Sequence, residues 1–111
     1  MATEIVELKV SEEISASTDV CDTYTPASGK NVYLLEFFGD AAFSENSVVM
    51  ITWDYGGGSE EIVWSTKGSA RDNGLKELIG TGDGVKKVAV CCSNGETGAL
   101  VMFCKALLGV E

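Results

Sequence analysis

The sequence predicts an all-β protein: a single antiparallel β-sandwich, jelly-roll-like, with seven or eight short strands. Short runs of alternating apolar and polar residues recur along the 111 residues, and no stretch shows a convincing helical periodicity. Turn residues separate these runs at intervals of roughly ten residues, which is typical of sandwiches and small barrels. We expect one domain covering residues 1–111, because this length is close to the commonest domain size.

The first half of the chain contains three expected strands. Residues 5–10 alternate as a half-buried strand, which residues 11–17 extend or follow with a second short strand. Residues 20–24 give a further extended piece. The only proline lies in the turn 25–30, and residues 31–38 then form a strong strand.

The second half is dominated by a predicted hairpin at residues 48–66, whose turn is glycine-rich and which contains both tryptophans. Residues 67–80 are interpreted as a polar connection with at most a short turn, because glycines bracket its few leucines. Residues 85–92 and 99–108 are predicted strands. Asn94-Gly95 between them is the strongest short hairpin signal in the chain.

Apolar residues occupy both faces of the strands at 31–38 and 99–108. In a two-sheet sandwich only the inner faces are buried, so outward positions should be polar. An excess of outward apolar residues marks a protein–protein interface, and a closed ring such as a homotrimer would bury it. The predicted interface residues are Leu35, Phe37, Val101, Phe103 and Leu107.

Composition excludes several classes of function. The net charge of −9 argues against nucleic acid as a partner, since phosphate binding needs a basic surface. The chain has no histidine, which removes the commonest general base and the usual zinc ligand. No apolar run approaches the length of a membrane span, and we expect no signal peptide and synthesis in the cytoplasm.

The four cysteines, Cys21, Cys91, Cys92 and Cys104, contain no C-x-x-C pair, so neither a zinc ribbon nor a thioredoxin-like site is indicated. Cys91 and Cys92 are adjacent in a predicted strand and should point to opposite faces. We expect free, buried cysteines that pack as small apolar residues. A disulfide between Cys92 and Cys104 requires their strands to pair, which the sequence does not determine.

No motif indicates catalysis, a metal or another cofactor. The Gly56-Gly57-Gly58 run is followed by two glutamates and a strand, as in a hairpin turn and unlike a phosphate loop. The loop aspartates lack the spacing of a calcium loop, and Glu60 and Glu61 face opposite sides of a strand. Trp53, Tyr55 and Trp64 match a sugar-stacking platform, although core packing explains them better.

Three segments together resemble the small β-sandwich virion proteins of tailed bacteriophages. They are TYTPASGK at 23–30, VVMITWDY at 48–55 and EEIVWSTKG at 60–68, joined by the closing stretch 88–98 with its SNGETG turn. The resemblance spans most of the chain and rests on turn-and-strand patterns. Proteins of that family decorate or cement the capsid, or form head fibres and tail appendages, typically as trimers, and the resemblance supplies no active site.

The resemblance implies a non-enzymatic virion structural protein, a capsid decoration protein that binds across neighbouring capsomers and stabilises the shell by mass action. Its expected partners are further copies of itself, as a homotrimer, and the major capsid protein. No nucleic acid, membrane or cofactor is expected, and assembly into the virion would occur in the host cytoplasm. The alternative function is a glycan-binding tail or head-fibre appendage in which Trp53, Tyr55 or Trp64 stacks on sugar.

Overall fold

The chain forms eight β-strands and, in the part described, no helix. The computed structural model describes the backbone of residues 3–41, 44–67 and 70–111, and the side chains of these residues outside 66–75. No helix able to span a bilayer occurs among those residues. The strands are β1 (Glu4–Ile14), β2 (Asp19–Tyr24), β3 (Asn31–Asp40), β4 (Val48–Trp53), β5 (Glu61–Lys67), β6 (Ala70–Thr81), β7 (Val88–Ser93) and β8 (Leu100–Val110).

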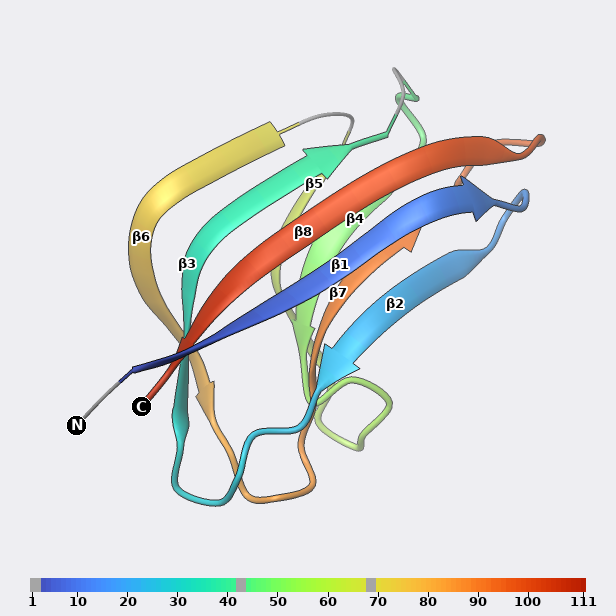
Figure 1. Cartoon of the computed structure of the whole chain (residues 1–111). Coiled ribbons are helices and arrows are strands. Elements are labelled where there is room, and N and C mark those ends of the chain that lie inside the picture. The colour runs from blue at the N-terminus through green and yellow to red at the C-terminus, as the bar shows by residue number, and fades with distance from the viewer. Residues whose placement is uncertain (1–2, 42–43, 68–69) are drawn as a thin grey trace.

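The strands form two four-stranded antiparallel sheets that face each other, so the predicted all-β sandwich is confirmed (Figure 1). Sheet A has the order β1-β8-β3-β6, and sheet B has the order β2-β7-β4-β5. This interleaving places β1 beside β8 and β2 beside β7, which is the double Greek-key arrangement of a jelly roll. Strands from opposite halves of the chain therefore pair within each sheet, β1 with β8 in sheet A and β2 with β7 in sheet B.

The core lies between the two sheets and follows the predicted alternation on most strands. On β8 the buried side chains are every second residue from Met102 to Val110, and Val101 on the opposite face is 65% exposed. Strand β7 is buried along nearly its whole length, because it is an inner strand of sheet B. The largest fully buried side chains from other strands are Ile14, Val32, Phe37, Val49 and Ile51.

A β-bulge in β3 reverses one predicted pair of faces. Leu34 pairs with Leu108 and Glu36 pairs with Leu107, so Leu35 is an extra residue in the register. A bulge of this kind shifts every later side chain to the opposite face. Phe37 is consequently fully buried, and the expectation that Phe37 points outward is wrong.

The segment 67–80 is also different from its prediction. Lys67 ends β5, residues 68–69 lie outside the described part, and from Ala70 the chain forms the twelve-residue strand β6 at the edge of sheet A, where a polar connection was expected. Its backbone pairs with β3 across two register irregularities, which accommodate a sequence without clean alternation. Gly80 lies in this strand because the ring of Trp53 packs directly against its Cα and leaves no room for a side chain.

Asn94-Gly95 does not form the predicted two-residue hairpin. Strand β7 belongs to sheet B and β8 to sheet A, so residues 94–99 cross from one sheet to the other. Gly95 does not have the positive φ that such a hairpin turn requires, and it lies instead against the backbone of Asn46. The hairpin predicted at 48–66 is confirmed as β4 and β5, although β5 is an edge strand and not the centre of the core.

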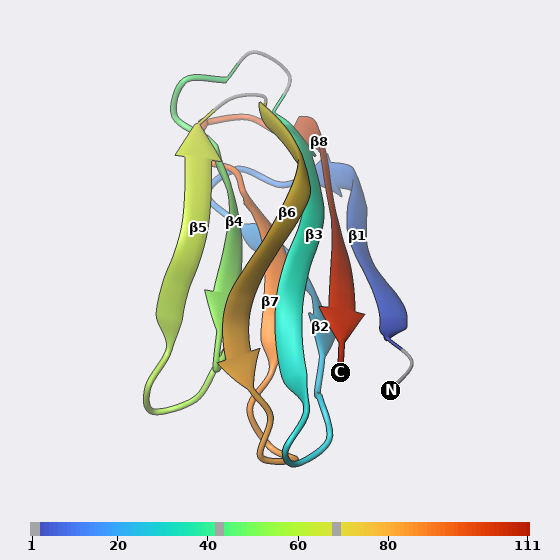
Figure 2. The same ribbon diagram turned by 90° about the vertical axis from the view of Figure 1, so that its left-hand side faces the viewer.

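The two lateral sides of the sandwich differ. On one side β1 and β2 approach each other, and the backbone N–H of Lys9 donates a hydrogen bond to Asp22 Oδ2 at 3.0 Å. On the other side β5 and β6 are the edge strands of the two sheets, and they are consecutive in the chain (Figure 2). All four of these strands are edge strands, since within the described residues each has a single strand neighbour, and the β5–β6 side therefore presents two unpaired backbone edges.

Candidate binding site

A cleft of about 280 Å³ opens between the edge strands β5 and β6. Strand β5 contributes four consecutive lining residues, β6 contributes three, and β3 contributes one from the core behind them. The lining residues are Leu34, Glu61, Ile62, Val63, Trp64, Glu77, Leu78 and Ile79. The cleft therefore lies where the two sheets separate.

The base of the cleft is attached to the core through Trp64. Its ring lies 4.3 Å, centroid to centroid, from the ring of Phe37, which is fully buried. Trp64 itself is only half-buried, so it joins the core to the cleft. The bulge that turns Phe37 inward thus also sets the position of this tryptophan.

Two exposed aliphatic residues from different sheets border the cleft. Ile62 is 58% exposed and Leu78 is 57% exposed. Six large apolar residues in the described part of the chain are exposed, and two of them border this one cleft. Ile62 pairs with Thr52 and Leu78 pairs with Tyr33, at outward positions of their strands, so these two side chains lie on the outer faces of the sheets beside the cleft.

The cleft also contains two exposed carboxylates, Glu61 and Glu77. Neither has a hydrogen-bond or ion-pair partner among the residues whose side chains are described. The neighbouring cation, Lys76, is occupied elsewhere: its ammonium lies 2.9 Å from Glu111 Oε1 and 5.1 Å from the centre of the Tyr33 ring. The site therefore combines an apolar base with negative charge at its rim.

Sequence reasoning missed this cleft. Glu77, Leu78 and Ile79 lie in the segment that the sequence predicts as a connection. The clearest signal was the pair of branched residues Leu78-Ile79 within a stretch that could have been read as an irregular edge strand.

The structure separates the residues predicted to form an interface. Leu35, Val101, Phe103 and Leu107 lie on the outer face of sheet A, as expected, whereas Phe37 is in the core. Phe103 packs edge-on against Phe38 at 5.4 Å, and this contact half-buries both rings. Whether this face contacts another subunit stays a prediction.

The three aromatics of the proposed sugar platform do not share one surface. Trp53 is 9% exposed and packs on Gly80 inside the sandwich. Trp64 lies in the cleft, and Tyr55 is 38% exposed in the turn after β4. These positions do not form a flat stacking platform.

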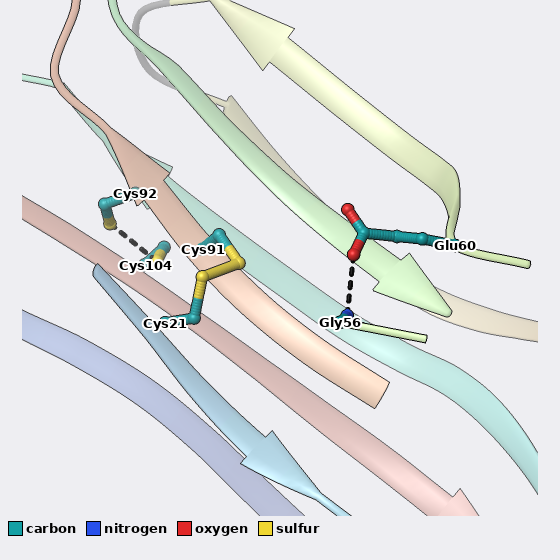
Figure 3. The surroundings of a disulfide bond; sticks show 6 residues. All are labelled: Cys21, Gly56, Glu60, Cys91, Cys92 and Cys104. Carbon is teal, nitrogen blue, oxygen red and sulfur yellow. Dashed lines mark hydrogen bonds between the residues drawn. A yellow bond between two sulfur atoms is a disulfide. The ribbon is translucent and has the colours of Figure 1, made fainter. Parts of the chain in front are cut away.

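The cysteines form two pairs, and the expectation that all four are free is wrong for one of them (Figure 3). Cys21 and Cys91 face each other across β2 and β7 and form a disulfide. Cys92 and Cys104 are fully buried, as predicted, and their sulfur atoms, which carry no bond in this structure, lie 2.7 Å apart. The hydrogen bond with Cys92, together with burial, raises the pKa of the Cys104 thiol.

The glycine-rich segment after β4 is a hairpin turn, as predicted, and two carboxylates hold it. The backbone N–H of Gly56 donates to Glu60 Oε2 at 2.6 Å (Figure 3), and that of Ser59 donates to Asp54 Oδ2 at 3.0 Å. Asp54 has a φ of 56°, a left-handed conformation that aspartate tolerates better than most residues. Both carboxylates, Glu60 and Asp54, are therefore hydrogen-bonded to backbone groups of the turn.

A second polar network closes the opposite end of the sandwich. Ser44 donates a hydrogen bond to Glu96 Oε1 at 2.7 Å, and Asn46 donates to the same oxygen at 3.0 Å. These two hydrogen bonds lower the pKa of Glu96. These hydrogen bonds join the loop before β4 to the loop between β7 and β8, so their role is structural. Among the described residues no group of three or more metal-ligating side chains is present.

No family model matches the chain, and no curated protein matches it. Among solved structures, it is similar to the crystal structure of Aeromonas hydrophila PliG, a periplasmic lysozyme inhibitor of g-type lysozyme. The two share 11% sequence identity over 98% of this chain and 88% of that chain, with a TM-score of 0.46.

The comparisons give no support to the function expected from the sequence. The similar structure is that of a periplasmic lysozyme inhibitor and not of a virion protein, and the predicted role in capsid decoration, with its glycan-binding alternative, is not kept. At this identity and TM-score the likeness assigns no function to the chain. The β5–β6 cleft is accordingly the feature from which a function is argued.

Proposed function

We propose that this protein is a non-enzymatic binding module that takes an extended segment of a partner protein into the β5–β6 cleft. The observation that carries the proposal is a cleft with Trp64 at its base, which two unpaired strand edges flank and two carboxylates border. Edge strands recognise extended peptides by adding a strand, with backbone hydrogen bonds giving affinity and side-chain pockets giving specificity.

The size of the cleft favours a peptide side chain over a small-molecule cofactor. Its volume of about 280 Å³ lies just below the roughly 300–1,000 Å³ that is usual for small-molecule sites. One aliphatic or aromatic side chain of a partner fits such a space, packed on Trp64 between the edges of β5 and β6. Because β5 supplies half of the lining, the partner backbone is expected beside the free edge of β5.

Charge defines the rest of the partner. Glu61 and Glu77 lie at the cleft, and the whole chain has a net charge of −9. A lysine or arginine beside the inserted apolar residue would pair with these carboxylates, and the general negative field would accelerate its association. The expected partner segment is therefore extended and basic, with a central apolar side chain.

The first experiment measures peptide binding by isothermal titration calorimetry. In an extended peptide alternate residues share a face, so the probe Thr-Lys-Thr-Leu-Thr-Lys-Thr presents its leucine and both lysines on one side. Control peptides replace the leucine by aspartate or both lysines by glutamate. We expect the probe to bind, and both controls to bind more weakly or not at all. Absence of binding by the probe would overturn the proposal.

Charge-reversal variants locate the binding. Glu61→Lys with Glu77→Lys should weaken binding of the probe at least roughly fourfold, because each exposed attraction of about 0.2–1 kcal/mol becomes a repulsion of similar size. Glu12→Lys with Glu13→Lys is the matched control, since it changes the net charge equally at exposed positions of β1 away from the cleft. Equal weakening by both pairs of substitutions would show that only net charge matters, contrary to a localised site.

A further inference from the structure

Two buried thiols face each other across the core of the sandwich. Adjacent residues of a strand point to opposite faces, and in β7 this separates Cys91 from Cys92. Cys91 is bonded to Cys21 within sheet B. Cys92 points into the core, where it meets Cys104 from β8 of sheet A (Figure 3).

The two sulfur atoms are already within reach of a covalent bond. Their separation is 2.7 Å, compared with about 2.05 Å in a disulfide and roughly 3.5–4.0 Å between packed, non-bonded carbon atoms. Both residues are fully buried. Their strands belong to different sheets, so a bond here would join sheet A to sheet B, unlike the Cys21–Cys91 bond within one sheet.

We propose that Cys92 and Cys104 form a second disulfide, which links the two sheets through the core. The pairing uses all four cysteines, and it does not depend on the binding role of the cleft. The reaction needs an oxidant of the disulfide class, such as oxidised glutathione. One thiolate attacks the oxidant and releases the first glutathione thiol. The second thiolate then attacks the mixed disulfide, releasing the second thiol as the Cys92–Cys104 bond forms.

Burial determines when this reaction occurs. The thiolate is the attacking species, and the closed sandwich both disfavours thiolate at Cys104 and leaves no exposed sulfur at either residue. Oxidation is therefore expected during folding, before the two sheets close over the pair. Only twelve positions separate the two cysteines, so they remain near each other in the unfolded chain.

The test is refolding of the full chain followed by thiol counting. The protein is reduced in denaturant, refolded in a glutathione redox buffer, denatured again with an alkylating reagent and analysed by mass spectrometry without reduction. The expected result is no alkylated cysteine, with peptide mapping that links Cys92 to Cys104. Two alkyl groups, at Cys92 and Cys104, with Cys21 bonded to Cys91, would overturn the proposal.

Two variants separate this bond from the other one. A Cys21→Ser, Cys91→Ser chain should also show no alkylation after refolding, because only the inter-sheet pair remains. A Cys104→Ser chain should show one alkyl group, at Cys92. A wild-type chain in which Cys92 is bonded to Cys91 or Cys21 would equally contradict the proposal. This test uses the wild-type protein, so it does not depend on whether a variant folds.

Discussion

Asn94 is predicted to be the most costly polar residue to remove. Its side chain is 1% exposed and lies where β7 leaves sheet B. The amide nitrogen donates to the carbonyl oxygens of Ile14 at 2.8 Å and Gly98 at 3.0 Å, and the amide oxygen accepts from the N–H of Glu96 at 2.8 Å. One side chain thus satisfies backbone groups from the end of β1 and from the loop between the sheets.

The cost of Asn94→Ala follows from those three hydrogen bonds. Each contributes about 1 kcal/mol net, and losing one partner of a buried pair costs at least that much. We expect the free energy of unfolding to fall by about 3 kcal/mol, a large share of the 5–15 kcal/mol typical of a domain. With a urea dependence of about 1.5 kcal/mol per molar, the unfolding midpoint should fall by about 2 M.

Equilibrium urea unfolding followed by tryptophan fluorescence measures this change. Thr97→Ala, at an exposed position of the same loop, is the matched control and should shift the midpoint little. Asn94→Asp retains the size of the side chain but turns an oxygen toward two carbonyls, so it should destabilise at least as much as alanine. A midpoint shift for Asn94→Ala as small as that of Thr97→Ala would refute the reasoning.

Three further predictions concern packing, charge and the first disulfide. Gly80→Val should destabilise the fold by about 1–3 kcal/mol in the same urea assay, because its Cβ would overlap the tryptophan ring packed on this glycine; an unchanged midpoint would contradict that packing. Lys76 lowers the pKa of Glu111, so their pair stabilises the fold above the ordinary carboxyl pKa and loses this effect as the pH falls through the lowered value. The melting-temperature difference between wild type and Lys76→Met should therefore shrink on acidification, and a constant difference would exclude the ion pair as its cause. Replacing both Cys21 and Cys91 by serine removes a cross-link with a sequence separation of 70. The loss of this constraint on the unfolded chain should lower the free energy of unfolding by about 4 kcal/mol. Urea unfolding of the folded variant measures this change, and a loss below about 1 kcal/mol would contradict it.

The sequence predicted the class of fold because alternation is a local property. The faces of β1, β7 and β8 follow directly from position, because residues two apart share a face while the register is continuous, and the turns around Pro26 and Gly56–Ser59 lie where their turn chemistry places them. Alternation holds only while the register is continuous. The single extra residue Leu35 was enough to exchange the faces of Phe37 and Phe38.

The candidate site was not predictable in the same way, because it depends on which strands are neighbours. Alternation determines the faces of strands and not their order in a sheet. The cleft exists because β5 and β6 are both edge strands. The sequence of β6 does not alternate between apolar and polar residues, and Gly74 and Gly80 within it are untypical of a strand. The pairing of Cys21 with Cys91 depends on strand order for the same reason.

The central claim is that the β5–β6 cleft binds a basic, extended segment. The most direct measurement is a titration of isotope-labelled protein with the peptide Thr-Lys-Thr-Leu-Thr-Lys-Thr, followed by two-dimensional NMR. The account predicts that shift changes cluster on residues 61–64 and 77–79, and that the indole N–H of Trp64 moves more than that of buried Trp53. Shift changes centred instead on Phe103 and the outer face of sheet A, or no changes at all, would contradict it.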